Sequence, residues 1–147
     1  MENIIIREMN KNEIDVVRKL VLDTFIEFEA PDYSEEGIQS FKDFIFDDEK
    51  FLNLKINVIE IEDKIVSMIA IRNRTHIALL FTNKDFHKKG LARKLFNDFK
   101  SSLKDGDKIT VNSSPYAVEV YKKLGFEIVE PEQTVDGIRF TKMMMEI

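Results

Sequence analysis

The segment Thr75–Leu103 has the sequence THIALLFTNKDFHKKGLARKLFNDFKSSL and decides the fold. It opens with an apolar run over residues 75–82, which predicts a strand. After a short polar connection the spacing of the apolar residues becomes three and four, which is typical of one face of a helix. That face consists of Ala92, Leu95, Phe96, Phe99 and Leu103. The segment therefore predicts a strand, a tight loop and a helix in succession.

The loop between this strand and this helix has the features of an anion-binding site. Backbone N–H groups and the positive end of the helix dipole converge where the helix begins, beside Lys88 and Lys89. Gly90 and Ala92 have little or no side chain, so that a ligand can approach the backbone closely. Residues 87–92 are therefore predicted to bind a phosphate group.

A second motif, SPYAVEVYKKLGF, occupies residues 114–126. It predicts a helix with Ser114 as its cap, Pro115 at its first position and Gly125 at its end. Ala117 and Tyr121 are four residues apart and share one face of that helix. The small side chain leaves room beside the phenol for the end of an extended ligand.

Together the two motifs resemble those of the GNAT superfamily of N-acetyltransferases. His87-x-x-Gly90-x-Ala92 is similar to the Gln/Arg-x-x-Gly-x-Gly/Ala loop of that family, with histidine at the first position, and Lys84 stands where many members have proline. Residues 114–126 resemble the family's Asn-x-x-Ala-x-x-x-Tyr-x-x-x-Gly-Phe segment, with Ser114 at the asparagine position and Asn112 two residues earlier.

The resemblance covers the chain in the order β-α-α-β-β-β-α-β-α-β-β. It implies a mixed α/β (α+β) fold, with a mostly antiparallel sheet and helices on both faces. Residues 1–147 are expected to form one domain of this kind. The strand at residues 79–82 would splay from the strand at residues 109–113 and admit the pantetheine arm of acetyl-CoA.

The resemblance also implies roles for particular residues. A backbone N–H near Phe81 or Thr82 would polarise the thioester carbonyl, and an amine would attack it directly. Tyr121 would protonate the leaving thiolate as the general acid. The residues expected to bind acetyl-CoA are Leu80, Phe81, Thr82, His87, Lys88, Lys89, Gly90, Leu91, Ala92, Asn112 and Ala117.

The general base and the acceptor are left open by the motifs. An alkylamine must lose a proton before it attacks, and His76, Glu60 and Glu29 are candidates for removing it. The loop between the first two helices contains Glu27, Glu29, Asp32 and Tyr33, which suits a cationic amine, although a solvated connection has the same composition. Small amines, a protein N-terminus and a lysine side chain all remain as acceptors.

The rest of the chain supplies the other elements. Residues 3–9 predict a strand, and Asn12 predicts the cap of a helix that ends before residues 29–33. Ser34 caps a second predicted helix. Residues 55–61 and 64–71 predict a hairpin, and further strands are expected at residues 108–112, 126–129 and 138–144.

Composition narrows the class of protein. The chain has 147 residues, no cysteine and a net charge of −5, which excludes disulfides and thiolate chemistry and disfavours general nucleic-acid binding. It lacks an apolar run long enough to span a membrane and a signal-peptide pattern, so a cytoplasmic protein is expected. No bound metal is expected. The fold also allows a homodimer.

Two alternatives to an N-acetyltransferase remain. One is an acyl-CoA-binding sensor that does not catalyse. The other is a nucleotide-binding enzyme, although both common nucleotide-binding glycine motifs are absent from the sequence.

Overall fold

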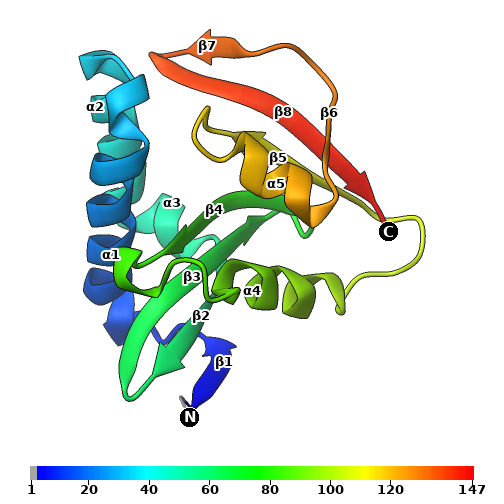
Figure 1. The fold of residues 1–147 in the computed structure, drawn as a ribbon. Helices are drawn as coiled ribbons and strands as arrows, with labels where there is room; N and C mark the ends of the chain where they lie inside the picture. Colours follow the sequence, from blue (N-terminus) through cyan, green and yellow to red (C-terminus); the bar gives the residue numbers. More distant parts are fainter. Residues whose placement is uncertain (1–2) are drawn as a thin grey trace.

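The computed structural model describes residues 3–147, in which eight strands form one mixed sheet with helices on both faces (Figure 1). The predicted α/β fold and the order of its elements are confirmed. The strands are β1 (Ile4–Glu8), β2 (Lys55–Ile61), β3 (Lys64–Arg72), β4 (His76–Thr82), β5 (Lys108–Ser113), β6 (Glu127–Ile128), β7 (Gln133–Val135) and β8 (Ile138–Glu146). The α-helices are α1 (Ile14–Phe28), α2 (Glu35–Ile45), α3 (Asp48–Leu52), α4 (Leu91–Lys100) and α5 (Val118–Leu124). Short 3-10 turns lie at η1 (Lys11–Glu13), η2 (Ala30–Asp32) and η3 (Lys84–Phe86).

The strands follow the spatial order β1-β2-β3-β4-β5-β8-β6, and β7 pairs with β8. All these pairs are antiparallel except that of β4 with β5. This parallel junction divides the sheet into two halves, and Figure 1 shows β4 and β5 parting from it.

Two hydrophobic cores lie on opposite faces of the sheet. The first is covered by α4 and α5, with Leu95, Phe96 and Tyr121 among its buried residues. The second is covered by α1, α2 and α3, with Phe25 and Ile45 fully buried. The apolar stripe predicted for α4 is therefore its packing face.

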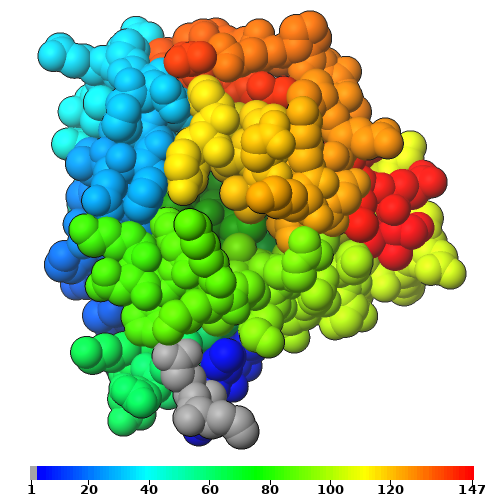
Figure 2. All heavy atoms as spheres, viewed as in Figure 1, coloured from blue at the N-terminus to red at the C-terminus, as the bar shows by residue number. Residues whose placement is uncertain are grey.

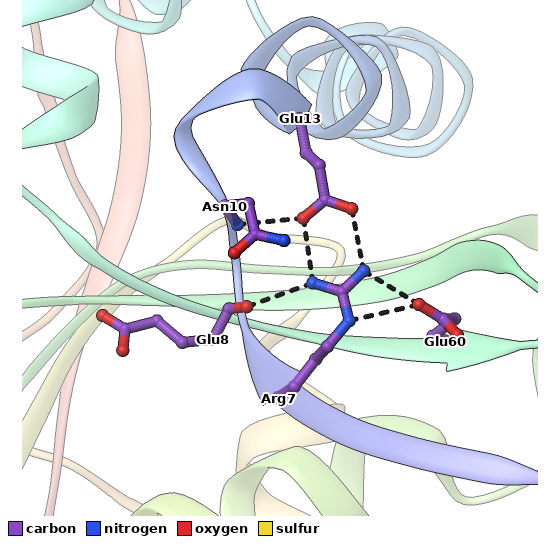
Figure 3. A network of polar contacts seen from close by, with 5 residues as sticks. All are labelled: Arg7, Glu8, Asn10, Glu13 and Glu60. Atoms are coloured by element: carbon purple, nitrogen blue, oxygen red, sulfur yellow. Dashed lines mark hydrogen bonds and ion pairs between the residues drawn. The ribbon is translucent and has the colours of Figure 1, made fainter.

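The N-terminal strand is joined to its neighbours by a polar network (Figure 3). The Arg7 guanidinium donates to the carboxylates of Glu13 on η1 and Glu60 on β2, at 2.7 and 2.9 Å for the closest pairs. Hydrogen bonds from Arg7 and from the backbone N–H of Asn10 lower the pKa of Glu13 to about 2. The predicted cap at Asn12 is therefore wrong: the chain turns into the helix at Asn10, because Glu13 reaches back to that N–H group at 2.9 Å.

Three elements differ from the sequence prediction. The short helix α3 was not predicted, and the side chain of Asp47 caps it by accepting from the N–H of Lys50. The short strand β7 pairs with β8 and was also missed. The last helix begins at Val118 and not at Pro115, because the Ser114 hydroxyl accepts from the N–H of Ala117 and closes a separate turn before the helix.

Candidate functional site

A β-bulge opens the sheet where the predicted ligand would enter. In the β3–β4 ladder Ala70 pairs with Leu79 and Ile71 pairs with Ile77, so that Ala78 is an extra residue on β4. Pairing of β4 with β5 stops at the same place, after Ile77. Because a bulge bends and twists its strand, β4 leaves β5 at this point, and the expected splay is present.

The backbone of β4 beyond the bulge has free groups facing this gap. The N–H of Asn83 donates to the carbonyl of Val66 on β3. Since alternate residues of a strand direct their backbone groups to opposite sides, Phe81 also faces β3, whereas Leu80 and Thr82 face the gap. Of the two residues expected to supply the N–H donor, Thr82 therefore faces the gap and Phe81 does not, while Leu80 faces it as well. The Thr82 carbonyl already accepts from Nε2 of His87 at 2.7 Å.

The loop between β4 and α4 has the geometry predicted for an anion site. Lys88 and Gly90 are left-handed, with φ of 63° and 75°, and the chain turns sharply at these residues before α4 begins. The first intrahelical bond of α4 runs from the N–H of Lys94 to the carbonyl of Gly90. The N–H groups of the three preceding helical residues therefore have no acceptor within the helix and lie at its positive end.

This loop forms one wall of the larger of two cavities, with a volume of about 530 Å³. Figure 2 shows this face of the molecule hollowed between the light-green loop, the yellow and orange segment around α5, and the blue α1. Phe28 of α1 lies at the boundary, with its ring 5.0 Å from that of His87 and 5.3 Å from that of Tyr116. The walls thus come from three separated parts of the chain.

Most of the predicted cofactor residues line this larger cavity. They are Leu80, Phe81, Thr82, His87, Lys88, Gly90, Leu91, Ala92 and Ala117. Two predicted residues do not line it. Lys89 lies with its ammonium 5.1 Å from the centre of the Phe86 ring, and Asn112 lines the smaller cavity instead. Sequence reasoning missed Arg93 and Lys123, two cations of the larger cavity joined by an Arg93 hydrogen bond to the Lys123 carbonyl. The position of Arg93, three residues after Gly90, was the available signal.

The smaller cavity, of about 200 Å³, lies on the other side of the gap. Aromatic side chains from the α1–α2 connection, α2 and β4 form one part of its wall. They are Tyr33, Phe41, Phe44 and Phe81. Ile138 at the start of β8 contributes from the opposite end of the chain.

The two cavities share five lining residues, which mark where they meet. These are Glu29, Leu80, Phe81, Ala117 and Tyr121. Glu29 is placed here because α1 ends at Phe28, just before Pro31, which cannot continue a helix. Tyr121 is directed here by α5 and is 5% exposed.

Glu29 and Tyr121 influence each other electrostatically. Burial raises the pKa of Glu29 to about 7; the nearby Asp32 adds to this rise, and the hydroxyl of Ser114 opposes it. The pKa of Tyr121 is raised well above its usual range, first by burial and then by the charge of Glu29. At neutral pH Tyr121 is therefore protonated, while Glu29 can exchange a proton.

The other two candidate bases are less suited to that role. His76 lines the smaller cavity, but burial and the charge of Arg72 lower its pKa to about 4, and its Nδ1 contacts the Thr110 hydroxyl at 2.8 Å. Glu60 is held by Arg7 (Figure 3) and lines neither cavity. Within residues 3–147 no cluster of three or more His, Asp or Glu side chains could hold a metal ion, and the expectation of no metal stays a prediction.

Comparison with known proteins agrees with this fold. A family model described as an acetyltransferase (GNAT) domain matches residues 29–147. The structure is similar to that of a GCN5-related N-acetyltransferase from Rhodopseudomonas palustris, with a TM-score of 0.84, 18% identity, and coverage of 100% of this chain and 98% of the other. It also resembles the PaiA N-acetyltransferase from Thermoplasma acidophilum in complex with coenzyme A, with a TM-score of 0.74, 16% identity and 99% coverage of both chains. No match was found among curated protein sequences.

The chain therefore belongs to the GNAT family of N-acetyltransferases. The family model describes an acetyltransferase, so its general activity is the transfer of an acetyl group, and the acceptor is not defined by the family. Among residues 3–147, none of the helices has the length and apolar character needed to cross a membrane.

Proposed function

We propose that this chain, as one acetyltransferase domain, transfers the acetyl group of acetyl-CoA to a primary amine by direct attack on the thioester. Acetyl-CoA would occupy the larger cavity and the amine the smaller one. The observation that carries this proposal is the meeting of the two cavities at Glu29 and Tyr121. A group on each side of the β4–β5 gap can react only where the cavities join.

The pyrophosphate of acetyl-CoA would lie at the N-terminus of α4. The N–H groups of the first turn of α4, which have no acceptor within the helix, supply backbone donors. Lys88, Arg93 and Lys123 supply positive charge around the same cavity. This arrangement supports the assignment of the loop at residues 87–92 to phosphate binding.

Leu80 is the best placed donor for the thioester carbonyl. Its backbone faces the gap, and it lines both cavities. A backbone N–H at this position would polarise the carbonyl and then hold the oxyanion after attack. The other gap-facing residue, Thr82, lines only the larger cavity and suits the pantetheine arm.

Glu29 would act as the general base. It accepts a proton from the ammonium form of the substrate, and the neutral amine then attacks the carbonyl carbon. A carboxylate with a pKa of about 7 is half ionised near neutrality, which matches the working range of a general base. Its partial burial and its place on both cavities support a position beside the reacting amine.

Tyr121 would supply the proton that the leaving thiolate needs. Its raised pKa keeps it protonated before the reaction, but also makes it a reluctant donor to a thiolate of pKa about 8.5. Once Glu29 has taken the proton of the amine, its charge is lost, and with it one of the two causes that raise the pKa of Tyr121. Proton uptake by Glu29 therefore makes Tyr121 a better acid at the step that requires one.

The test is turnover with a panel of primary amines. The protein is incubated with acetyl-CoA and each amine, free thiol is measured, and the acetylated amine is identified by mass spectrometry. We expect thiol release that depends on the amine and yields the amide. Tight acetyl-CoA binding with no amide from any amine, peptide or protein acceptor would instead favour a CoA-binding sensor.

A further inference from the structure

Arg72 is the one arginine among residues 3–147 whose guanidinium has no hydrogen-bond or ion-pair partner in the described chain. The other five arginines each bond a carboxylate or a backbone carbonyl. Arg72 is exposed at the end of β3, opposite His76, and lines the smaller cavity. The planar guanidinium can bond both oxygens of a carboxylate at once, so a ligand in this cavity is offered an unused anion-binding group.

The charges that face the smaller cavity lie at its two ends. Glu29 is at the junction with the larger cavity, and Arg72 is at the other end, together with the exposed Asn112. His76 adds no positive charge near neutral pH, because burial and Arg72 lower its pKa to about 4. No other titratable lining group within the described chain besides these and the phenols of Tyr33 and Tyr121 faces the cavity.

The wall between these ends is apolar and too long for the two charged groups to share one small polar ligand. Leu80 is at the junction and His76 at the far end, and four residues of strand, with the bulge at Ala78 between them, correspond to at most roughly 13 Å. Phe41 and Phe44 on α2 and Phe81 on β4 line this span, and the ring of Phe41 lies 6.2 Å from that of Phe81. Such a wall favours an aromatic or alicyclic body.

We propose that the acceptor is a zwitterion: a primary amine separated by an apolar spacer from a carboxylate that pairs with Arg72. This inference rests on the proposed function and specifies its substrate class. The amine would lie beside Glu29, and the spacer would lie against the phenylalanines. The α-amine of an amino acid does not fit as the acceptor, since it is attached to the same carbon as the carboxylate. A polyamine would leave Arg72 facing a second positive charge.

The experiment compares three probes with the full chain and acetyl-CoA. They are 4-(aminomethyl)phenylacetate, its methyl ester, which keeps the amine but lacks the carboxylate charge, and the polyamine spermidine. We expect kcat/KM at least tenfold higher for the acid than for the ester, and lower still for spermidine. Arg72→Gln should lower kcat/KM for the acid to about that for the ester, so that the preference for the acid is lost. Lys55→Gln is the matched control, since it deletes an exposed charge on β2, opposite Ile71, that lines neither cavity.

Equilibrium binding of acid and ester to the CoA-bound protein is measured in parallel. Equal use and equal binding of acid and ester, or a loss in Arg72→Gln that is the same for both, would overturn the inference. A preference for spermidine would overturn it as well. If no amine is acetylated but the acid still binds through Arg72, the proposed function fails while the recognition of a carboxylate is retained.

Discussion

Gly37 in the first turn of α2 lies directly against Gly137 in the turn between β7 and β8. A Cβ on Gly37 would overlap the Gly137 carbonyl, and a Cβ on Gly137 would approach the backbone N of Gly37. The same contact includes a 2.9 Å hydrogen bond from the Ser40 hydroxyl to the Asp136 carbonyl. It joins α2 to the β7–β8 hairpin, and both elements line the smaller cavity.

Gly37→Ala should therefore loosen one wall of the smaller cavity. The added methyl has backbone atoms in its way, so the hairpin must shift, and overpacking of this kind costs about 1–3 kcal/mol. We expect a lower melting temperature and a higher KM for the acceptor, with an unchanged Kd for acetyl-CoA. Ser40→Ala, which removes only the hydrogen bond at the same contact, should produce a smaller change of the same sign. An altered Kd for acetyl-CoA with an unaltered acceptor KM would contradict this division of the two cavities.

Ala92→Glu tests the phosphate site without straining the backbone. Gly90 is less suitable for this purpose, because its φ of 75° makes any side chain costly. Ala92 is in the first turn of α4, where a carboxylate is favoured by the helix dipole and should not destabilise the fold. Ala92 also lines the larger cavity, where a negative charge would repel a phosphate. We expect a retained melting temperature and at least a tenfold weaker Kd for acetyl-CoA by isothermal titration. Asn97→Glu, an exposed position on the same helix, adds the same charge and should leave the Kd nearly unchanged.

Glu29→Gln should alter the pH dependence of the reaction. If Glu29 is the base, kcat/KM of the wild type rises as pH increases through about 7, because the carboxyl must lose its proton to accept one from the amine. The variant should lose this rise and should be slower by roughly 10²-fold at pH 7.5. Glu27→Gln is the matched control: Glu27 is a neighbouring exposed carboxylate, 3.4 Å from the ammonium of Lys84, and lines neither cavity. If Glu29→Gln and Glu27→Gln show the same rise in kcat/KM through about pH 7, Glu29 is excluded as the base.

The same substitution has a consequence for stability. The folded state raises the pKa of Glu29 from 4.5 to about 7 and thus binds its proton more tightly than the unfolded state. Stability is therefore lost as pH rises from about 4.5 through 7. Glu29→Gln, which resembles the protonated form, should melt at a higher temperature than the wild type at pH 8 and at a similar temperature at pH 4. A lower melting temperature at pH 8 would mean that the ionised carboxyl is stabilised by the fold.

The sequence was most informative where periodicity and motif agreed. The apolar spacing of α4 and the small residues at Gly90 and Ala92 predicted both the helix and the loop at its start. The bulge at Ala78 could not be predicted, because it follows from the pairing of β4 with β3 and not from the identity of the residue. Glu29 was one of three candidate bases by sequence, and its selection requires knowing that the end of α1 lies across the gap from α5. That the guanidinium of Arg72 has no partner among residues 3–147 likewise follows only from the positions of the carboxylates in that part of the chain.

Tyr121→Phe is the most direct test of the chemical step. The substitution removes one oxygen from a buried side chain and keeps the ring that lies 5.5 Å from that of Phe126, so the fold and the Kd for acetyl-CoA should be retained. The leaving thiolate then lacks its proton donor, and kcat should fall by about 10²-fold or more. Tyr116→Phe is the control, because Tyr116 lines only the larger cavity and is 45% exposed. The expected fall should also be smaller for an acyl donor whose leaving thiol is more acidic, since such a thiolate leaves without a proton. A Tyr121→Phe variant that acetylates a good acceptor at the wild-type rate would show that the phenol only packs between the cavities.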